Sequence, residues 1–187
     1  HCQINLFDFE TGEKNLRISF EKLIKEKDTT PNLLDNFSQI FFGLNYNPYY
    51  SAEQIYLYYK QFDQKFGVPL QKHWQPFPQI KKNKPKLKIG YVSPDFKKHS
   101  VENFLKPVLK NHNHKKFEIY AFAELSQEDS TTQEYKSYVD QWVPTQGFTD
   151  WEMAQKIREL EIDVLVDVAG HTKGNRLGVF AYKPAPI

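Results

Sequence analysis

The second half of the chain alternates short apolar runs with amphipathic segments, and this alternation limits the fold more than any other feature. Strands are predicted at "LKIGYV", "FEIYAFAEL", "QWVP" and "IDVLVDVAG", the last a β-branched run typical of a strand buried on both faces. Helices are predicted between them, the first from Ser100 as its N-cap and the third opened by Thr149 with Glu152. Strands separated by helices form βαβ units, so the sequence predicts an α/β fold with a mostly parallel sheet.

The first part of the chain, up to about residue 80, has helical rather than alternating periodicity. Three segments carry apolar residues at three-to-four spacing, namely 13–28, 30–46 and 51–67. Ser51 with Gln54 predicts a capping box at the start of the third helix, and Gly67 followed by Pro69 predicts its C-terminal cap. We therefore expect a helical segment over 1–79 and an α/β region over 80–187.

The composition limits the compartment and the partners. A formal charge of +2 requires no partner of opposite sign, and a single cysteine is compatible with a reducing, cytoplasmic location. No apolar stretch approaches the ~20 residues of a membrane helix. The five lysines between Lys81 and Lys88 are interpreted as a solvated linker rather than a nucleic-acid site, because aromatic residues do not interleave them. We expect neither nucleic acid nor membrane as a partner.

Two polar clusters follow predicted strands, "SPDFKKHS" at 93–100 and "DVAGHTKGNR" at 167–176. The carboxyl ends of parallel strands meet at one rim of a sheet, where ligands bind in open α/β folds. A neutral His99 could accept a proton, and Asp95 could orient its ring or relay that proton. The alternative is that Asp95 caps a turn while His99 is an ordinary surface residue.

Glycines and further histidines offer weaker signals. Gly170 and Gly174 could bring backbone amides close to phosphate or sugar oxygens, or could simply form a tight turn. The glycine pattern is neither a dinucleotide fingerprint nor a Walker loop, so nothing supports NAD or ATP. His112 and His114 lack further ligands in the sequence, so a solvated turn is favoured over a metal site.

Several motifs, in order, resemble the O-GlcNAc transferase/SPINDLY family: "FFGLNYNPYYSAEQIY", "KLKIGYVSPDFKKHSVENFLKPVL", "FEIYAFAE" and "IDVLVDVAGHTKGNRLGVFAYKPAPI". The resemblance covers residues 30 to 187 and implies the N-terminal, Rossmann-like lobe of a two-lobed GT-B glycosyltransferase. The helices at 1–79 would then connect it to tetratricopeptide repeats, as in bacterial members. The first residue is not methionine and the final prolines resemble the approach to another strand, so we expect a fragment without the nucleotide-sugar lobe.

The resemblance also implies roles for individual residues. His99 and Asp95 match the histidine and aspartate of the family's S-x-D-F-x-x-H motif, a proposed base and a proposed proton acceptor. Tyr46 lies near an active-site histidine of animal members. Substrate-binding residues are expected to be Tyr46, Ser100, Gly170, His171, Thr172, Lys173, Gly174, Asn175 and Arg176. Neither a metal nor a cofactor is implied, since the nucleotide sugar is a substrate.

The implied activity is inverting transfer of a sugar, normally GlcNAc from UDP-GlcNAc, to Ser or Thr of acceptor proteins. Two alternatives stay open: an O-fucosyltransferase that uses GDP-fucose, as in plant SPINDLY-type members, and a degenerate, non-catalytic binding or scaffold protein. A lysine and a helix N-terminus in the other lobe would stabilise the departing diphosphate. We therefore expect these 187 residues alone to be inactive.

Overall fold

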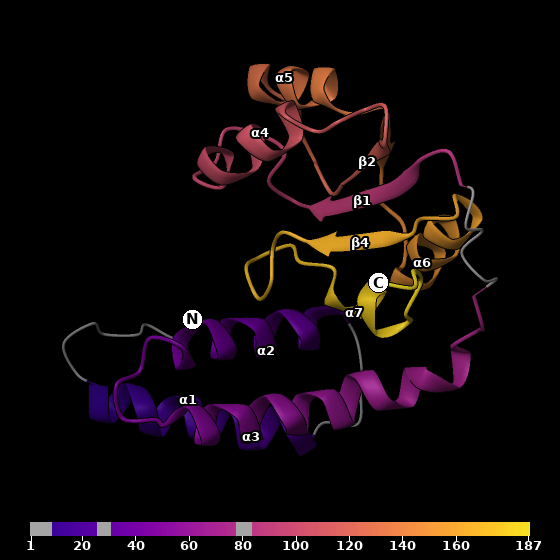
Figure 1. Ribbon diagram of the computed structural model, residues 1–187. Coiled ribbons are helices and arrows are strands. Elements are labelled where there is room, and N and C mark those ends of the chain that lie inside the picture. Colours follow the sequence, from indigo (N-terminus) through magenta and orange to yellow (C-terminus); the bar gives the residue numbers. More distant parts are fainter. Residues whose placement is uncertain (1–8, 26–30, 78–83) are drawn as a thin grey trace. The chain divides into compact units, whose positions relative to one another are not determined.

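The computed structural model describes residues 9–25, 31–77 and 84–187 (Figure 1). The chain forms two compact units, which are described separately. The first contains the residues up to Leu70 together with His171–Lys173, and the second contains Gln71–Gly170 and Gly174–Ile187. The expected domain division at residues 79 and 80 stays a prediction.

The first unit is helical, as the periodicity predicted. In it α2 packs against both α1 and α3, and their apolar stripes meet in a core rich in phenylalanine. The helices are α1 (Phe9–Lys25), α2 (Pro31–Leu44) and α3 (Ala52–Phe62). The buried core residues are Phe20, Phe37, Ile40, Phe41, Leu44 and Phe66.

The start of α3 confirms its prediction, whereas the predicted end is wrong. Ser51 and Gln54 form the capping box. Instead of a left-handed cap at Gly67, the chain continues through a π-helical turn (Asp63–Gly67) and a 3₁₀ turn (Val68–His73). A Cβ at Gly67 would meet the carboxylate of Asp63, which would have to turn aside for any larger residue.

The second unit contains a four-stranded, all-parallel sheet in the order β3-β2-β1-β4, which confirms the α/β prediction. The chain passes from β1 to β2 to β3 in one direction and then returns to place β4 on the other side of β1. This reversal puts a topological switch point beside β1, where open α/β sheets bind ligands. The strands are β1 (Leu87–Ser93), β2 (Phe117–Ala123), β3 (Gln141–Pro144) and β4 (Val164–Asp167).

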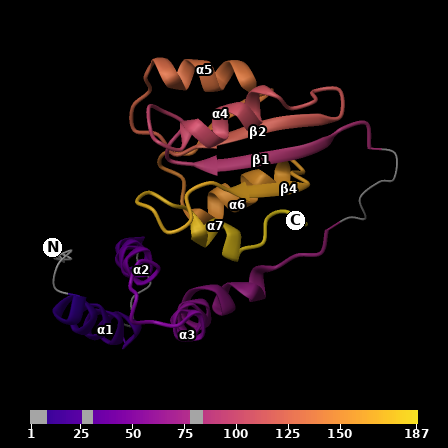
Figure 2. The same cartoon turned by 60° about the vertical axis from the view of Figure 1, so that its left-hand side comes forward.

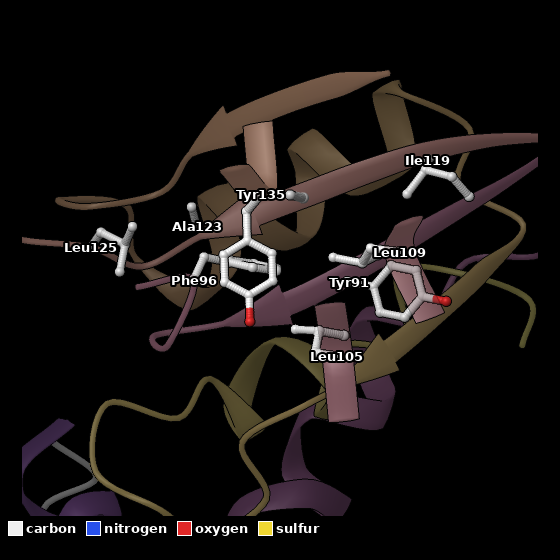
Figure 3. Packing of buried hydrophobic residues seen from close by; sticks show 9 residues of the cluster. Tyr91, Phe96, Leu105, Leu109, Ile119, Ala123, Leu125 and Tyr135 are labelled. Carbon is white, nitrogen blue, oxygen red and sulfur yellow. The ribbon is translucent and has the colours of Figure 1, made fainter. Parts of the chain in front are cut away.

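Helices cover both faces of this sheet (Figure 2). On one face lie α4 (Glu102–Lys110) and α5 (Ser130–Tyr138), and on the other α6 (Asp150–Glu159) and α7 (Leu177–Ala181). Side chains alternate along a strand, so Tyr91 enters the α4/α5 core while its neighbour Val92 enters the α6/α7 core. Figure 3 shows the first of these cores, with Phe96 of the loop after β1 packed into it.

Two local expectations in this unit are wrong. The helix α4 begins at Glu102, and its N-cap residue is Val101 rather than Ser100; Val101 makes no side-chain cap. Its entry is a turn instead, in which the amide of Glu102 donates to the carbonyl of His99. The strand β4 is half-buried rather than buried on both faces, because it is the edge strand of the described sheet.

The last residue pairs beside β4. Leu165 N donates to Ile187 O at 2.8 Å, and Ile187 N donates to Asp163 O at 3.3 Å. Ile187 thus bonds to the residues before and after Val164, which is the hydrogen-bond pattern of a parallel pair. The expected approach of the final segment to another strand stays a prediction.

The lysine-rich linker is only partly described, since 78–83 lie outside the described residues. Its described lysines are less solvated than expected. Lys84 Nζ forms an ion pair with Asp163 at 2.5 Å, and Lys88 Nζ donates to Leu160 O at 2.9 Å. These contacts attach the residues at the start of β1 to the loop that precedes β4.

Candidate functional site

The two polar clusters predicted from sequence lie after neighbouring strands of the sheet. The strands β1 and β4 pair in parallel with Val92 opposite Asp167, so the loops that follow them start side by side. A Cβ added to Gly174 would lie 3.1 Å from Cβ of Pro94, which shows that the two loops approach closely. The structure therefore confirms that the first cluster and the part of the second that belongs to the sheet unit, 167–170 and 174–176, share the carboxyl-end rim at the switch point.

The first loop holds His99 beside Asp95. Nδ1 of His99 lies 3.7 Å from Oδ2 of Asp95, a separation suited to an ion pair but too long for a hydrogen bond. The same nitrogen lies 3.3 Å from the backbone amide of Val101. Since Nδ1 cannot both accept from Val101 and donate to Asp95, these contacts belong to different tautomers.

The choice between these tautomers sets what His99 can do. When Nδ1 accepts from Val101, a neutral ring carries its proton on Nε2 and offers a hydrogen-bond donor there. When Nδ1 donates to Asp95, Nε2 has a free lone pair and becomes a candidate base. In the structure Nδ1 accepts from Val101 and Asp95 lies 3.7 Å away, so the base form requires Asp95 to replace Val101 as the partner of Nδ1. The catalytic roles of both residues stay predictions.

The second loop is shaped by its own aspartate. The carboxylate of Asp167 accepts hydrogen bonds from the amides of Ala169 at 3.0 Å and Gly170 at 2.9 Å. Gly170 and Gly174 have φ angles of 54° and 79°, which other residues rarely adopt. Both glycines are thus explained by backbone conformation, as the tight-turn alternative proposed.

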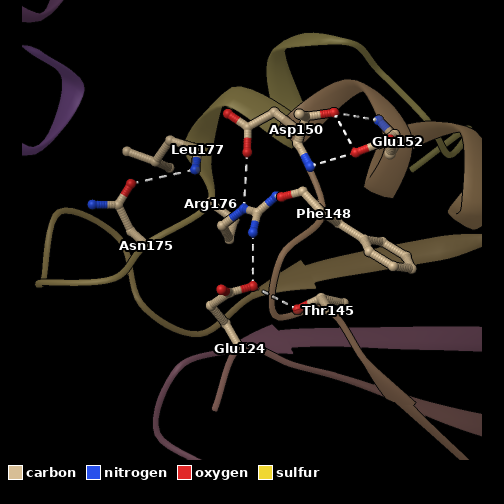
Figure 4. A network of polar contacts seen from close by, with 9 residues as sticks. Glu124, Thr145, Phe148, Asp150, Glu152, Asn175, Arg176 and Leu177 are labelled. Atoms are coloured by element: carbon tan, nitrogen blue, oxygen red, sulfur yellow. Dashed lines mark hydrogen bonds and ion pairs between the residues drawn. The ribbon is translucent and has the colours of Figure 1, made fainter. Parts of the chain in front are cut away.

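Arg176 lies in a polar network at the base of this loop (Figure 4). Its guanidinium donates to Glu124 Oε2 at 2.7 Å, to Asp150 Oδ1 at 2.8 Å and to Phe148 O at 2.8 Å. Glu124 also accepts from the hydroxyl of Thr145 at 2.7 Å. The side chain is only 11% exposed, so Arg176 joins the end of β2 to the start of α6.

The middle of the predicted substrate-binding segment belongs to the helical unit. Within that unit the imidazole of His171 lies among the rings of Phe41, Tyr59 and Phe62, with centroids 4.8, 5.3 and 5.6 Å away. Ser38 Oγ is 3.2 Å from its Nδ1. The neighbouring Thr172 and Lys173 fall in the same unit, whereas Gly170 and residues 174–176 belong to the sheet unit.

The remaining predicted residues are more loosely placed. Tyr46, in the helical unit, is 72% exposed and its ring lies against Phe42. The carbonyl of Ser100 accepts from the side chain of Asn103, and the side chain of Asn175 accepts from the amide of Leu177. Binding roles for Tyr46, Ser100 and Asn175 stay predictions.

Sequence reasoning missed Glu124 and Asp150, the partners of Arg176. One signal was available, because Glu124 lies near the carboxyl end of the strand predicted at 117–125, and so near the rim that carries the two clusters; in the structure it directly follows β2. It also misjudged His112, whose Nε2 lies 2.8 Å from the hydroxyl of Tyr91. Burial lowers the pKa of His112, the largest of the effects on it. This histidine is a packed residue rather than part of a solvated turn.

The described ranges contain one further hollow, away from the two rim loops. A hollow of about 600 Å³ lies along α6, lined by Phe148, Trp151 and polar side chains, and none of the predicted site residues lines it. Within 9–25, 31–77 and 84–187 there is no group of three His, Cys, Asp or Glu residues suited to a metal ion. No helix in these ranges has the length and apolar character to cross a membrane.

Comparison with known proteins identifies the family. The model of glycosyltransferase family 41 ("Glycosyl transferase family 41") matches residues 65–187, which include the whole sheet and both rim loops. The chain belongs to this family. The match covers more than half of the 187 residues.

Individual relatives agree with this family-41 membership. A barley (Hordeum vulgare) protein, "Probable UDP-N-acetylglucosamine--peptide N-acetylglucosaminyltransferase SPINDLY", is 31% identical over 78% of this chain and 16% of its own length. Its Arabidopsis thaliana counterpart is 34% identical over 54% of this chain and 12% of its own. A mutant O-GlcNAc transferase of Thermobaculum terrenum has a TM-score of 0.79 at 27% identity, covering 96% of this chain and 33% of that one. The family-41 chain thus spans a small part of its curated relatives.

Proposed function

We propose that this chain forms part of an inverting protein O-glycosyltransferase that transfers GlcNAc from UDP-GlcNAc to Ser or Thr side chains. The observation that carries the proposal is the placement of His99 beside Asp95 at the switch point of a family-41 sheet. Ligands bind at that rim in open α/β folds, so an acid–base pair there can take the proton that an acceptor hydroxyl must lose.

In the proposed reaction the acceptor oxygen attacks the anomeric carbon and the bond from that carbon to the diphosphate breaks. UDP leaves with the bonding electron pair, and the hydroxyl proton passes to the His99–Asp95 pair. His99 takes the proton at Nε2 while its Nδ1–H group is hydrogen-bonded to Asp95. The Asp95 carboxylate then stabilises the imidazolium that forms. The chain has no resident cofactor in this proposal, because the nucleotide sugar enters as a substrate. We place the reaction in the cytoplasm.

The proposal leaves the diphosphate to residues outside this chain. The chain covers 33% of the similar O-GlcNAc transferase structure, and transfer also needs stabilisation of the leaving group. We therefore expect the isolated 187 residues to show no transferase activity. Transfer of labelled sugar by the isolated chain would contradict this expectation.

The test uses the complete protein that contains this chain, offered UDP-GlcNAc and GDP-fucose separately with an acceptor protein. We expect turnover with UDP-GlcNAc, and a fall of roughly 100-fold or more in kcat for His99→Ala. His114→Ala is a matched control, because His114 is 41% exposed beside Asp140 while His99 is 43% exposed beside Asp95. His114 precedes β2, so it lies at the amino ends of the strands, away from the rim that carries His99.

Each outcome of this test has a distinct meaning. Turnover with GDP-fucose alone would support a glycosyltransferase but show that its donor is GDP-fucose rather than UDP-GlcNAc. A folded protein that is inactive with both donors would favour a binding or scaffold role. Equal activity of wild type and His99→Ala would remove His99 from the mechanism.

A further inference from the structure

The hollow of about 600 Å³ along α6 has the size of a ligand site, since such sites measure roughly 300–1,000 Å³. One part of its lining is the turn before the helix. The other part includes Trp151, Gln155 and Glu159, which recur every four residues and so share one face of α6. None of the residues expected to act in sugar transfer lines this hollow. It therefore requires an explanation of its own.

Two aromatic rings of the hollow are exposed to solvent and yet held in place. Trp151 is 40% exposed and Phe148 is 37% exposed. The Trp151 ring packs against Tyr182 and His73, with centroids 5.1 and 5.4 Å away. The carbonyl of Phe148 accepts from Arg176 at 2.8 Å, and Figure 4 shows its ring extending away from that network. Side chains fixed in this way lose little conformational entropy when a ligand packs on them.

The charged groups of the hollow already have partners. Oε2 of Glu152 accepts from the amide and from the hydroxyl of Thr149, both at 2.8 Å. Lys156 Nζ lies 3.4 Å from Oε2 of Glu159. Among the described residues that line the hollow, Lys156 is the one cation. A phosphate or a nucleotide would thus find no unpaired cation to bind it.

Two neutral amides complete the lining. In the part of the chain that the structure describes, the side chains of Gln146 and Gln155 make no hydrogen bond, so each offers donors and an acceptor to a ligand. The complementary ligand is uncharged, rich in polar groups and apolar on one face. A sugar ring has this chemistry, because its C–H groups pack on an aromatic ring while its hydroxyls bond to polar side chains.

We propose that the hollow along α6 binds a neutral sugar, either a free oligosaccharide or a sugar attached to a protein. In this complex one face of the sugar packs on Trp151 and Phe148, and its hydroxyls bond to the amides of Gln146 and Gln155. The inference goes beyond the proposed transfer reaction and does not depend on it, since binding is measured without turnover.

The test is ligand-observed NMR on the complete protein with four neutral disaccharides: cellobiose, lactose, mannobiose and diacetylchitobiose. We expect at least one to bind with a Kd of about 1 mM or below. Trp151→Ala should weaken this binding roughly tenfold by removing the stacking surface. Gln155→Met should weaken it roughly three- to tenfold, the worth of one neutral hydrogen bond, and methionine is as good a helix former as glutamine.

The matched control is Gln133→Met. Gln133 is also a helical glutamine, but it lies on α5 and donates to Glu128 at 3.1 Å, so its replacement should leave the Kd unchanged. Thermal unfolding of each variant establishes that it is folded. If Trp151→Ala proves unfolded, because Trp151 also packs on Tyr182, Gln155→Met still decides the test.

Three results would overturn the proposal. The first is that none of the four disaccharides binds. The second is a Kd that is the same in the wild type and in Gln155→Met. The third is binding that weakens in His99→Ala but persists in both variants of the hollow, which would place the sugar at the rim instead.

A peptide that carries GlcNAc on serine, compared with the same peptide unmodified, distinguishes the two sources of the sugar. Tighter binding of the glycopeptide than of any disaccharide would identify a protein-linked sugar, and the reverse order a free oligosaccharide. Binding of the unmodified peptide, lost in Gln155→Met and without binding of any sugar, would make the hollow a peptide site and overturn the proposal.

Discussion

Replacing Arg176 by methionine should destabilise the sheet unit strongly. Methionine preserves much of the length and apolar volume of the side chain but removes the cation. Two carboxylates, of Glu124 and Asp150, would then face each other's charge without the guanidinium that now bonds both. Phe148 O would lose its donor as well. The loss of stability comes mainly from the two carboxylates left without a cation rather than from the lost hydrogen bonds themselves.

The magnitude follows from the burial of the partners. Removing one member of a fully buried pair costs about 3–5 kcal/mol. Here Arg176 is 11% exposed, but Glu124 and Asp150 are 21% and 29% exposed, so water relieves part of the penalty. We expect a loss of about 2–4 kcal/mol, which at a usual urea slope of about 2 kcal/mol per molar lowers the unfolding midpoint by about 1–2 M.

The assay is urea unfolding followed by tryptophan fluorescence. The three tryptophans of the chain, Trp74, Trp142 and Trp151, all lie in the sheet unit, so their emission reports on the unit that contains Arg176. Lys156→Met is the control, since Lys156 pairs with Glu159 at 3.4 Å and both side chains are exposed, at 43% and 66%. Little change in its midpoint is expected, because exposed ion pairs contribute little.

Two results would refute this reasoning. The first is an Arg176→Met midpoint equal to that of the wild type. The second concerns the source of the cost: adding Glu124→Gln and Asp150→Asn to the variant should recover part of the loss, since it removes the uncompensated charges. No recovery would mean that the carboxylates are not its cause.

Two further predictions concern the same unit. Because burial lowers the pKa of His112, the unfolded chain binds a proton on this residue more tightly than the folded chain does. Stability should therefore fall as the pH drops below about 6.5 toward the folded pKa. The urea midpoint should decline less between pH 7 and 5 in His112→Gln than in the wild type, and an equal decline in both would contradict this. Thr149→Ala removes the oxygen that accepts from the amide of Glu152, so unfolding free energy should fall by about 1 kcal/mol, whereas Thr149→Ser, which keeps the acceptor, should lose clearly less.

Features that depend on near neighbours in the chain were predictable. The strand–helix alternation gave the parallel sheet, and the capping boxes at Ser51 and Thr149 formed as expected. The prediction of a helix end at Gly67 failed because its local signature fits such an end, while the chain instead continues through a π-helical turn and a 3₁₀ turn. Ser100 failed because the helix after it starts from a turn rather than from a side-chain cap.

The candidate site was predictable only in part. Two polar clusters after strands had to share a rim, and they do. The partners of Arg176 lie 52 and 26 residues away, so no local pattern reveals that its guanidinium is occupied. The packing of His171 among the rings of the helical unit likewise depends on distant residues.

The loop that carries Asp95 and His99 is anchored by an aromatic ring. Phe96, in the middle of the polar run "SPDFKKHS", is fully buried among Tyr135 and Trp142. The loop therefore cannot swing away without exposing a phenyl ring and leaving a void in the core. Opening the loop around Phe96 therefore amounts to local unfolding of the sheet unit, so the hydrogen-bonded amide of Asp95 should exchange with solvent more slowly than the amides of the exposed residues 99–100.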